Sequence, residues 1–179
     1  MKQQGFTLLE LIITVTIAAI VLVIGVPSFQ ETIRQNRLTA YTNQFVGSLN
    51  LARSEAIKRG RRVVVCPSTD GATCAASGDY EQGWIVFADA NANNATGDAG
   101  DVVIRVFEKM PAGMTLIGSA EVQGLVFYTP DGLAQRSNGT AVGNNAEWTV
   151  CKDSKAREIT ITTIGRVGVV SEPTSPTCP

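Results

Sequence analysis

The stretch Gly5-Phe6-Thr7-Leu8-Leu9-Glu10 opens a run of apolar residues that continues to Val26. From Leu8 to Val26 there are nineteen residues, and Glu10 is the only charged one. A helix needs roughly 20 residues to cross about 30 Å of hydrocarbon, so the length fits a membrane span. The carboxylate is unusual in such a segment, because an acid among lipid costs a few kcal/mol unless it finds a partner.

Three kinds of segment share this apolar pattern. A secretory signal peptide has a shorter apolar region, usually 7–15 residues, and a small-residue cleavage site, whereas Val26-Pro27-Ser28 follows here. A plain membrane anchor leaves Glu10 unexplained. The stretch from Gly5 to Leu11 closely resembles the signature of type IV prepilins, which accounts for both features.

The prepilin resemblance implies processing and assembly roles for three residues. It implies that a peptidase cleaves after Gly5, which makes residues 1–5 a leader, and that the new N-terminal residue, Phe6, is N-methylated. It also implies an assembly role for Glu10. The physical reason is that a buried carboxylate is costly alone and favourable beside a cation, so Glu10 can pair with the Phe6 amine of a neighbouring subunit.

Charge divides the rest of the chain into a basic and an acidic part. Residues 28–62 contain seven Lys or Arg and two acids, a net charge of +5, and residues 63–179 contain seven basic and thirteen acidic residues, a net charge of −6. A nucleic-acid-binding domain is normally strongly basic, and the second part is not. The chain has no histidine, so the most frequent general base and metal ligand is missing. No nucleophile elbow, phosphate loop or zinc motif is present, and we expect no enzymatic activity.

Four cysteines follow the apolar segment: Cys66, Cys74, Cys151 and Cys178. An even number in an exported domain favours disulfides, and three pairings are possible. We prefer Cys66–Cys74, which closes a short turn-rich loop, with Cys151–Cys178, which fastens the proline-rich end. The cysteines lack CxxC spacing, which argues against a zinc site.

The periodicity predicts one long helix over residues 6 to about 59, bent near Gly25-Val26-Pro27 because proline removes a backbone donor. After Pro27 apolar residues recur at steps of three and four, and this stripe is expected to dock on a sheet. Its members are Phe29, Ile33, Tyr41, Phe45, Leu49, Ala52 and Ala56. Gly60, after the cationic last turn, is expected to end the helix in the left-handed conformation.

From Arg61 on, short strands alternate with turns, and no second helical period appears. The expected strands are 62–66, 83–87, 102–107, 114–117, 125–129, 147–151 and 158–163. Short connections favour antiparallel pairing. The fold class is therefore α+β: a helix with a transmembrane part (6–27) and an amphipathic part (28–60), packed on an antiparallel head (61–179) with a disulfide-fastened tail.

The head resembles the GspH/FimT-type minor pilins and pseudopilins, and most closely the FimU/FimT minor pilins. The supporting stretches are 52–57, 63–67, 83–91, 127–132 and 163–166. The resemblance implies a minor pilin that initiates or primes assembly of a type IV pilus, connects tip components and supports twitching and adhesion. The alternatives are a type II secretion pseudopilin and a DNA-binding pilin for natural transformation.

Two stretches are candidate ligand sites. Residues 89–101 alternate Asp and Asn, and Asp89, Asn91, Asn93 and Asp98 are weak calcium candidates, because calcium takes six to eight oxygens. The spacing departs from an EF-hand, since no glutamate closes the loop. A plain loop rich in turn-forming residues is the simpler interpretation, so the expectation is no cofactor.

The second candidate site is Gly165-Arg166-Val167-Gly168. It resembles the sequence of DNA-receptor FimT proteins but keeps only Arg166 of two arginines, with Arg157, Lys152 and Lys155 as expected helpers. Affinity for DNA scales with the phosphates neutralised, so one arginine is a weak signal. Another basic run, Lys58 to Arg62, is more simply explained as charge at a helix C-terminus.

The expected partners are other major and minor pilins, the prepilin peptidase and an inner-membrane assembly platform. DNA is a weaker candidate. The expected location is the inner membrane, with one span and a periplasmic head, and then the extracellular pilus.

Overall fold

The computed structural model describes residues 7–75, 79–144, 146–171 and 178. The chain divides into two compact units, Met1–Arg37 and Leu38–Pro179. The helix α1 (Leu8–Arg59) contributes to both. It continues through Pro27 without a break, and Gly60 follows it with φ 62°, which confirms the expected left-handed end of the helix.

The first unit is an exposed helical segment. Large apolar side chains from Leu8 to Ile33 are 48–76% exposed. Phe29 and Ile33, which the periodicity assigned to a buried stripe, are 72% and 49% exposed. That part of the prediction is wrong. In the second unit the buried residues of α1 are Leu38, Thr42, Phe45, Ser48, Leu49, Ala52 and Ala56.

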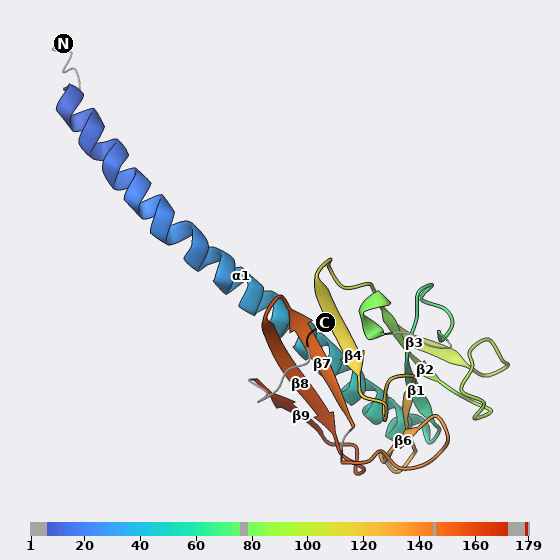
Figure 1. The fold of residues 1–179 in the computed structure, drawn as a ribbon. Coiled ribbons are helices and arrows are strands. Elements are labelled where there is room, and N and C mark those ends of the chain that lie inside the picture. Colours follow the sequence, from blue (N-terminus) through green and yellow to red (C-terminus); the bar gives the residue numbers. More distant parts are fainter. Residues whose placement is uncertain (1–6, 76–78, 145, 172–177, 179) are drawn as a thin grey trace. The chain divides into compact units, whose positions relative to one another are not determined.

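Nine strands in the described residues form two antiparallel sheets (Figure 1). The five-stranded sheet has the order β3-β2-β1-β5-β6, and the four-stranded sheet has the order β4-β7-β8-β9. The strands are β1 (Val63–Pro67), β2 (Trp84–Ala88), β3 (Val102–Phe107), β4 (Met114–Gly118), β5 (Val126–Tyr128), β6 (Ala134–Arg136), β7 (Glu147–Lys152), β8 (Lys155–Ile161) and β9 (Val167–Val170), with a short 3-10 helix η1 (Tyr80–Gln82) before β2. The α+β class is confirmed. The sequence predicted neither β6 nor β9.

The three central strands of the five-stranded sheet, β2, β1 and β5, are buried on both faces. Along β1, Val63 and Val65 face the main core, which includes residues of α1, while Val64 and Cys66 belong to a second cluster. Because both faces are covered, β1 and β2 are apolar at every position. The four-stranded sheet buries one face, so burial alternates along β4 as expected for a half-exposed sheet.

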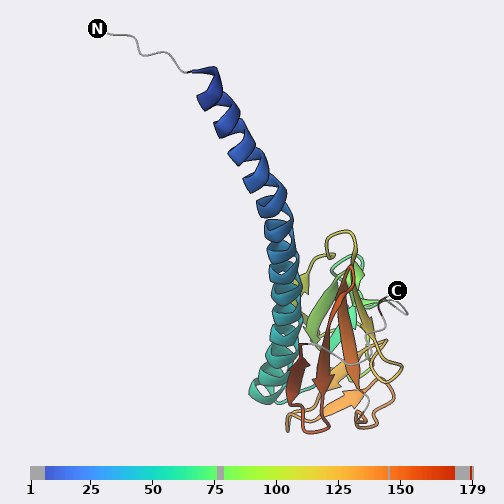
Figure 2. The ribbon, with the colours of Figure 1, turned by 60° about the vertical axis from the view of Figure 1, so that its left-hand side comes forward.

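Phe45 connects α1 to both sheets. Its ring lies 5.4 Å from Trp84 of β2 and 5.1 Å from Trp148 of β7, centroid to centroid, both edge to face. The ring of Tyr80 in η1 also contacts Phe45, with 5.1 Å between the two ring centroids. In Figure 2 the turquoise end of α1 runs beside the strands of the head. One helical side chain therefore fills the space where the two sheets diverge.

Candidate functional site

The start of α1 carries a helix cap. Gly5 and Phe6, the expected cleavage and methylation sites, lie outside the described residues. Thr7 precedes the helix, and its Oγ1 accepts a hydrogen bond from the Glu10 N–H at 3.3 Å. Thr7 and Glu10 thus have the spacing of a capping box, and the carboxylate lies in the first turn, where the helix dipole favours negative charge. The Thr-x-x-Glu pattern is present in the sequence, but its capping role was not predicted from it.

The surface that follows is apolar and uncharged. Between Glu10 and Glu31 no residue is charged, and an 18-residue window has a mean hydropathy of 2.7 with none of it buried. Thr14 and Thr16 donate their hydroxyl protons to carbonyls of the same helix, Leu11 O and Ile12 O. By length and composition this helix can cross a membrane.

A shallow apolar hollow of about 400 Å³ lies on this helix around Gly25, which has no side chain to fill it. No atom lies within 4 Å of a Cβ built on Gly25. The hollow is lined by Val21, Leu22, Gly25, Val26, Phe29, Gln30 and Ile33.

Arg166 lies on a tightly fixed turn between β8 and β9. The Gly165 N–H donates to Thr162 O at 2.8 Å, and the Thr162 N–H donates to Arg166 O at 3.0 Å. Gly165 has φ 75°, and a Cβ there would lie 2.3 Å from Gly132 O. Arg53 of α1 donates to that same Gly132 carbonyl at 3.2 Å. The Gly132 carbonyl and Arg53 therefore pack against the turn at Gly165. The Arg166 side chain is exposed.

Two of the three expected basic helpers of Arg166, Lys152 and Lys155, do not join it. Lys152 and Lys155 face each other where β7 turns into β8, at the opposite end of β8 from the Arg166 turn. Thr162 is seven residues along the chain from Lys155, about 23 Å at 3.3 Å per residue. Lys152 instead directs its Nζ toward the carbonyls of Ala112 and Gly113. Arg166 therefore shares no phosphate-binding surface with these two lysines.

The weak calcium candidates are engaged with N–H donors. The buried Asp89 carboxylate accepts hydrogen bonds from Arg62 and from the backbone N–H groups of Ala92, Asn93 and Asn94. Asp98 accepts from the amides of Asn91 and Asn93, and these bonds lower the pKa of Asp98. Over the residues that the structure describes, no group of three or more His, Cys, Asp or Glu could hold a metal. Calcium binding at these carboxylates would require these donors to be displaced.

The structure joins the two cysteine pairs that the sequence analysis preferred, Cys66–Cys74 and Cys151–Cys178. The loop closed by Cys66–Cys74 packs on the second apolar cluster of the five-stranded sheet, the one that contains Val64 and Cys66. The second bond fixes Cys178 to β7. Both stabilise the head by restricting the unfolded chain.

Comparison with known proteins decides the family. The sequence profile of "Type II transport protein GspH" matches residues 41–165, which is most of the chain. The chain belongs to this family. A second profile, "Prokaryotic N-terminal methylation motif", matches residues 1–26, so the GspH-family head follows a prepilin-type N-terminus.

Two known proteins resemble parts of this GspH-family protein. "Prepilin peptidase-dependent protein D" of Escherichia coli K12 is 44% identical over 45 residues, 25% of this chain and 31% of that protein. The match therefore spans about a third of the curated relative. The crystal structure of the Pseudomonas aeruginosa PAO1 type IV minor pilin FimU superposes with a TM-score of 0.56 at 19% identity, covering 75% of this chain and 89% of FimU. That likeness shows the fold.

Membership in this family establishes the general role. Its members are structural pilin-like subunits and not enzymes, and the apolar N-terminal helix is compatible with a membrane anchor. The sequence-based identification as a GspH/FimT/FimU-type pilin is confirmed.

Proposed function

We propose that this GspH-family protein is a minor pilin of a type IV pilus, which initiates or primes assembly and connects components at the tip. The observation that carries the proposal is the capped, uncharged apolar helix of the first unit, which precedes a head with the fold of FimU. Such a helix needs lipid before assembly and other apolar helices after it. In this role the protein supports twitching and adhesion.

The proposed route begins with a precursor held in the inner membrane. A prepilin peptidase cleaves after Gly5, Phe6 is methylated, and an inner-membrane platform delivers the subunit to the fibre. Glu10 then pairs with the Phe6 amine of a neighbouring subunit. This pairing sets the stagger of the helices, because an unpaired carboxylate inside an apolar bundle is destabilising by several kcal/mol.

Replacing Glu10 tests the proposed assembly step. Glu10→Gln should leave membrane insertion unchanged and reduce the subunit in sheared filaments at least tenfold, measured by immunoblot of filament and membrane fractions. The control is Glu31→Gln, an exposed acid on the same helix, which should assemble normally. Wild-type amounts of the Glu10 variant in filaments would contradict the assignment.

A type II secretion pseudopilin is the second candidate, favoured by the description of the matching family. Deleting the gene separates the two roles: loss of twitching with normal protein export supports the pilus, and loss of export with normal twitching supports secretion.

DNA uptake is the third candidate, supported by the exposed Arg166. It predicts salt-dependent binding of duplex DNA that Arg166→Ala weakens. Absence of binding at low salt would remove it.

A further inference from the structure

The edge strand β3 is open along one side. It is the terminal strand of the five-stranded sheet and pairs only with β2. Half of its backbone N–H and C=O groups therefore face away from the sheet. Among the described residues, no backbone hydrogen bond outside the sheet involves residues 102–107. Val102, Val103 and Val106 are 41–48% exposed, so the edge is apolar as well as unpaired.

Only the first half of β3 contains a feature that discourages pairing with a further strand. The register shifts between Val86 and Phe87 of β2, which leaves Ile104 as an extra residue in β3. Such a bulge twists an edge and discourages pairing. From Arg105 to Phe107 the register against β2 is regular, and no proline or lysine interrupts the strand. This segment is free to accept another strand.

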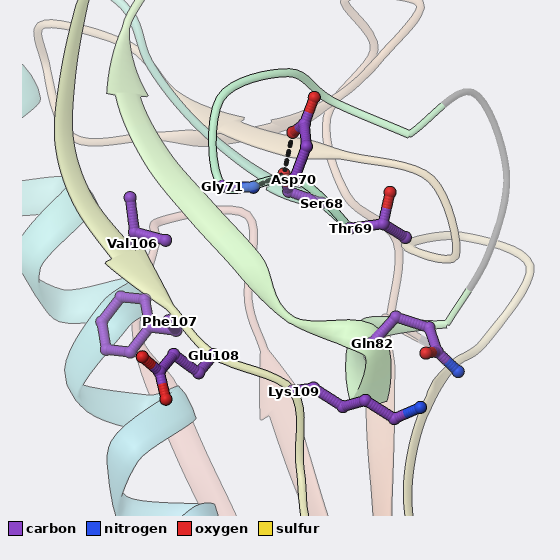
Figure 3. Close-up of a pocket in the computed structure, with 9 residues that line it drawn as sticks. All are labelled: Ser68, Thr69, Asp70, Gly71, Gln82, Val106, Phe107, Glu108 and Lys109. Carbon is purple, nitrogen blue, oxygen red and sulfur yellow. Dashed lines mark hydrogen bonds between the residues drawn. The ribbon is translucent and has the colours of Figure 1, made fainter.

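A hollow lies on each face of that segment. On the face of α1, one of about 320 Å³ is lined by Tyr41, Gln44, Arg105 and Phe107. On the opposite face, one of about 400 Å³ is lined by Val106 together with Gln82 and the disulfide loop at Ser68–Gly71 (Figure 3). The two hollows share Val106, Phe107, Glu108 and Lys109, and the Val106 side chain is the one that lies against Gly71 of the disulfide loop. Successive side chains of an extended chain point to opposite faces, so an added strand would fill the two hollows in turn.

Charge selects what the α1-side hollow accepts. The Arg105 guanidinium lies over the Phe107 ring, 5.2 Å from its centroid, and no carboxylate of the described chain forms an ion pair with it. Arg105 and Lys109 against Glu108 give this hollow a net charge of +1. The acid of the other hollow, Asp70, is already occupied: it accepts hydrogen bonds from Ser68, Ala72 and Thr73.

We propose that the Arg105–Phe107 edge of β3 binds an extended strand of a neighbouring pilin-like subunit, with an acidic side chain toward Arg105 and an apolar one against Val106. Strand addition takes its affinity from the main-chain hydrogen bonds and its specificity from pockets for alternate side chains. A second copy of this chain fits less well, because antiparallel self-pairing of β3 would bring two Arg105 side chains close together. This inference rests on the proposed function, since a pilus supplies the neighbouring subunit.

A synthetic peptide tests the edge directly. The probe is fluorescent Thr-Glu-Val-Glu-Val-Thr, titrated with the mature full chain in detergent micelles and followed by anisotropy. We expect saturable binding that weakens at least tenfold when alternate backbone amides are N-methylated, and equally when lysine replaces glutamate. Equal binding of the N-methylated peptide would overturn strand addition.

Matched variants locate the site. Arg105→Glu should weaken binding of the glutamate peptide at least tenfold and strengthen binding of the lysine peptide. Arg61→Glu, which replaces an exposed arginine elsewhere, should change the affinity for neither peptide. Val106→Asp should weaken binding, and Val169→Asp on the other sheet's edge should not. Unchanged binding by Arg105→Glu, or a concentration-dependent homodimer that Val106→Asp abolishes, would refute the proposal.

Filament incorporation separates this inference from the proposed function. Wild-type protein in filaments with at least fivefold less Arg105→Glu supports the strand contact. Equal incorporation of both refutes the contact while leaving the minor-pilin role intact. Absence of the wild type from filaments refutes the minor-pilin role itself, and with it the pilin partner.

Discussion

At the residue scale, a few polar groups and glycines fix the surface loops of the head. Asp89 is 1% exposed and pairs with Arg62, and three backbone N–H groups of its own loop also donate to it. The Asp89 carboxylate, a calcium candidate in the sequence, therefore organises its own loop. Only the arrangement of donors distinguishes the two roles, and donors from 27 residues away in the chain are not visible in a local pattern.

Gly165 is the most restrictive of these positions. Gly165→Ala combines a positive φ with a contact of 2.3 Å to a backbone carbonyl, and we expect a loss of about 2–4 kcal/mol in the free energy of unfolding. The control Gly139→Ala has φ 81° with nothing within 4 Å, so it should cost about 1 kcal/mol from strain alone. Urea denaturation of the mature chain in detergent measures both. Equal costs would show that the Gly165 contact is unimportant.

Glu158 gives a pH-dependent prediction. Burial first, and then the neighbouring Glu147, raise the pKa of Glu158 above its ordinary value of 4.5. A carboxyl with a raised folded-state pKa destabilises the fold when ionised, and the penalty disappears once pH falls below its unfolded pKa. Glu158→Gln should therefore stabilise the head at pH 7, by about 0.5 kcal/mol after solvent screening, and should have no effect below pH 4.

Thermal melts of wild type and variant at the two pH values check this sign. Glu108→Gln, which replaces an exposed acid without an ion pair in the described chain, should shift neither melt. A Glu158→Gln variant that is less stable than wild type at pH 7 would contradict the raised pKa.

At the element scale, one helix holds two sheets together. The sequence predicted the helix, its end at Gly60 and seven of the strands to within a few residues, because long apolar periods and turn residues are local signals. It missed β6 and β9, each of three or four residues with partial exposure. It also missed the division into two sheets, which depends on contacts such as Phe45 with Trp84 and Trp148.

Two site expectations show the same limit. Arg166 and Lys155 are eleven residues apart in sequence, yet they occupy opposite ends of β8. Phe29 and Ile33 continue the apolar period of α1, yet they lie in the exposed first unit. Periodicity reports which face is apolar, and it does not report what covers that face.

Phe45 carries the clearest energetic prediction at this scale. Phe45→Ala should lower the free energy of unfolding of the head by about 3–5 kcal/mol, since it leaves a cavity among three aromatic rings. Phe29→Ala, on the same helix but 72% exposed, should change it by less than about 0.5 kcal/mol. Denaturation followed by tryptophan fluorescence compares the two, and similar costs would refute the role of Phe45 in joining the sheets.

At the scale of the whole molecule, two units with opposite solvent requirements share one helix. Residues 11–30 of the first unit present an uncharged apolar surface, and the second unit has a buried core, two disulfides and an acidic balance. The exposed apolar helix of the first unit is long enough to cross a membrane. The single acid at the start of the first unit is what distinguishes it from an ordinary anchor.

Mass spectrometry of sheared and washed filaments tests the central claim most directly. The claim is that this chain is a processed subunit of a fibre. The account predicts that the protein is present in the filament fraction, begins at a methylated Phe6 and has both disulfides intact. Protein found only in the membrane fraction, with residues 1–5 still attached, would contradict it.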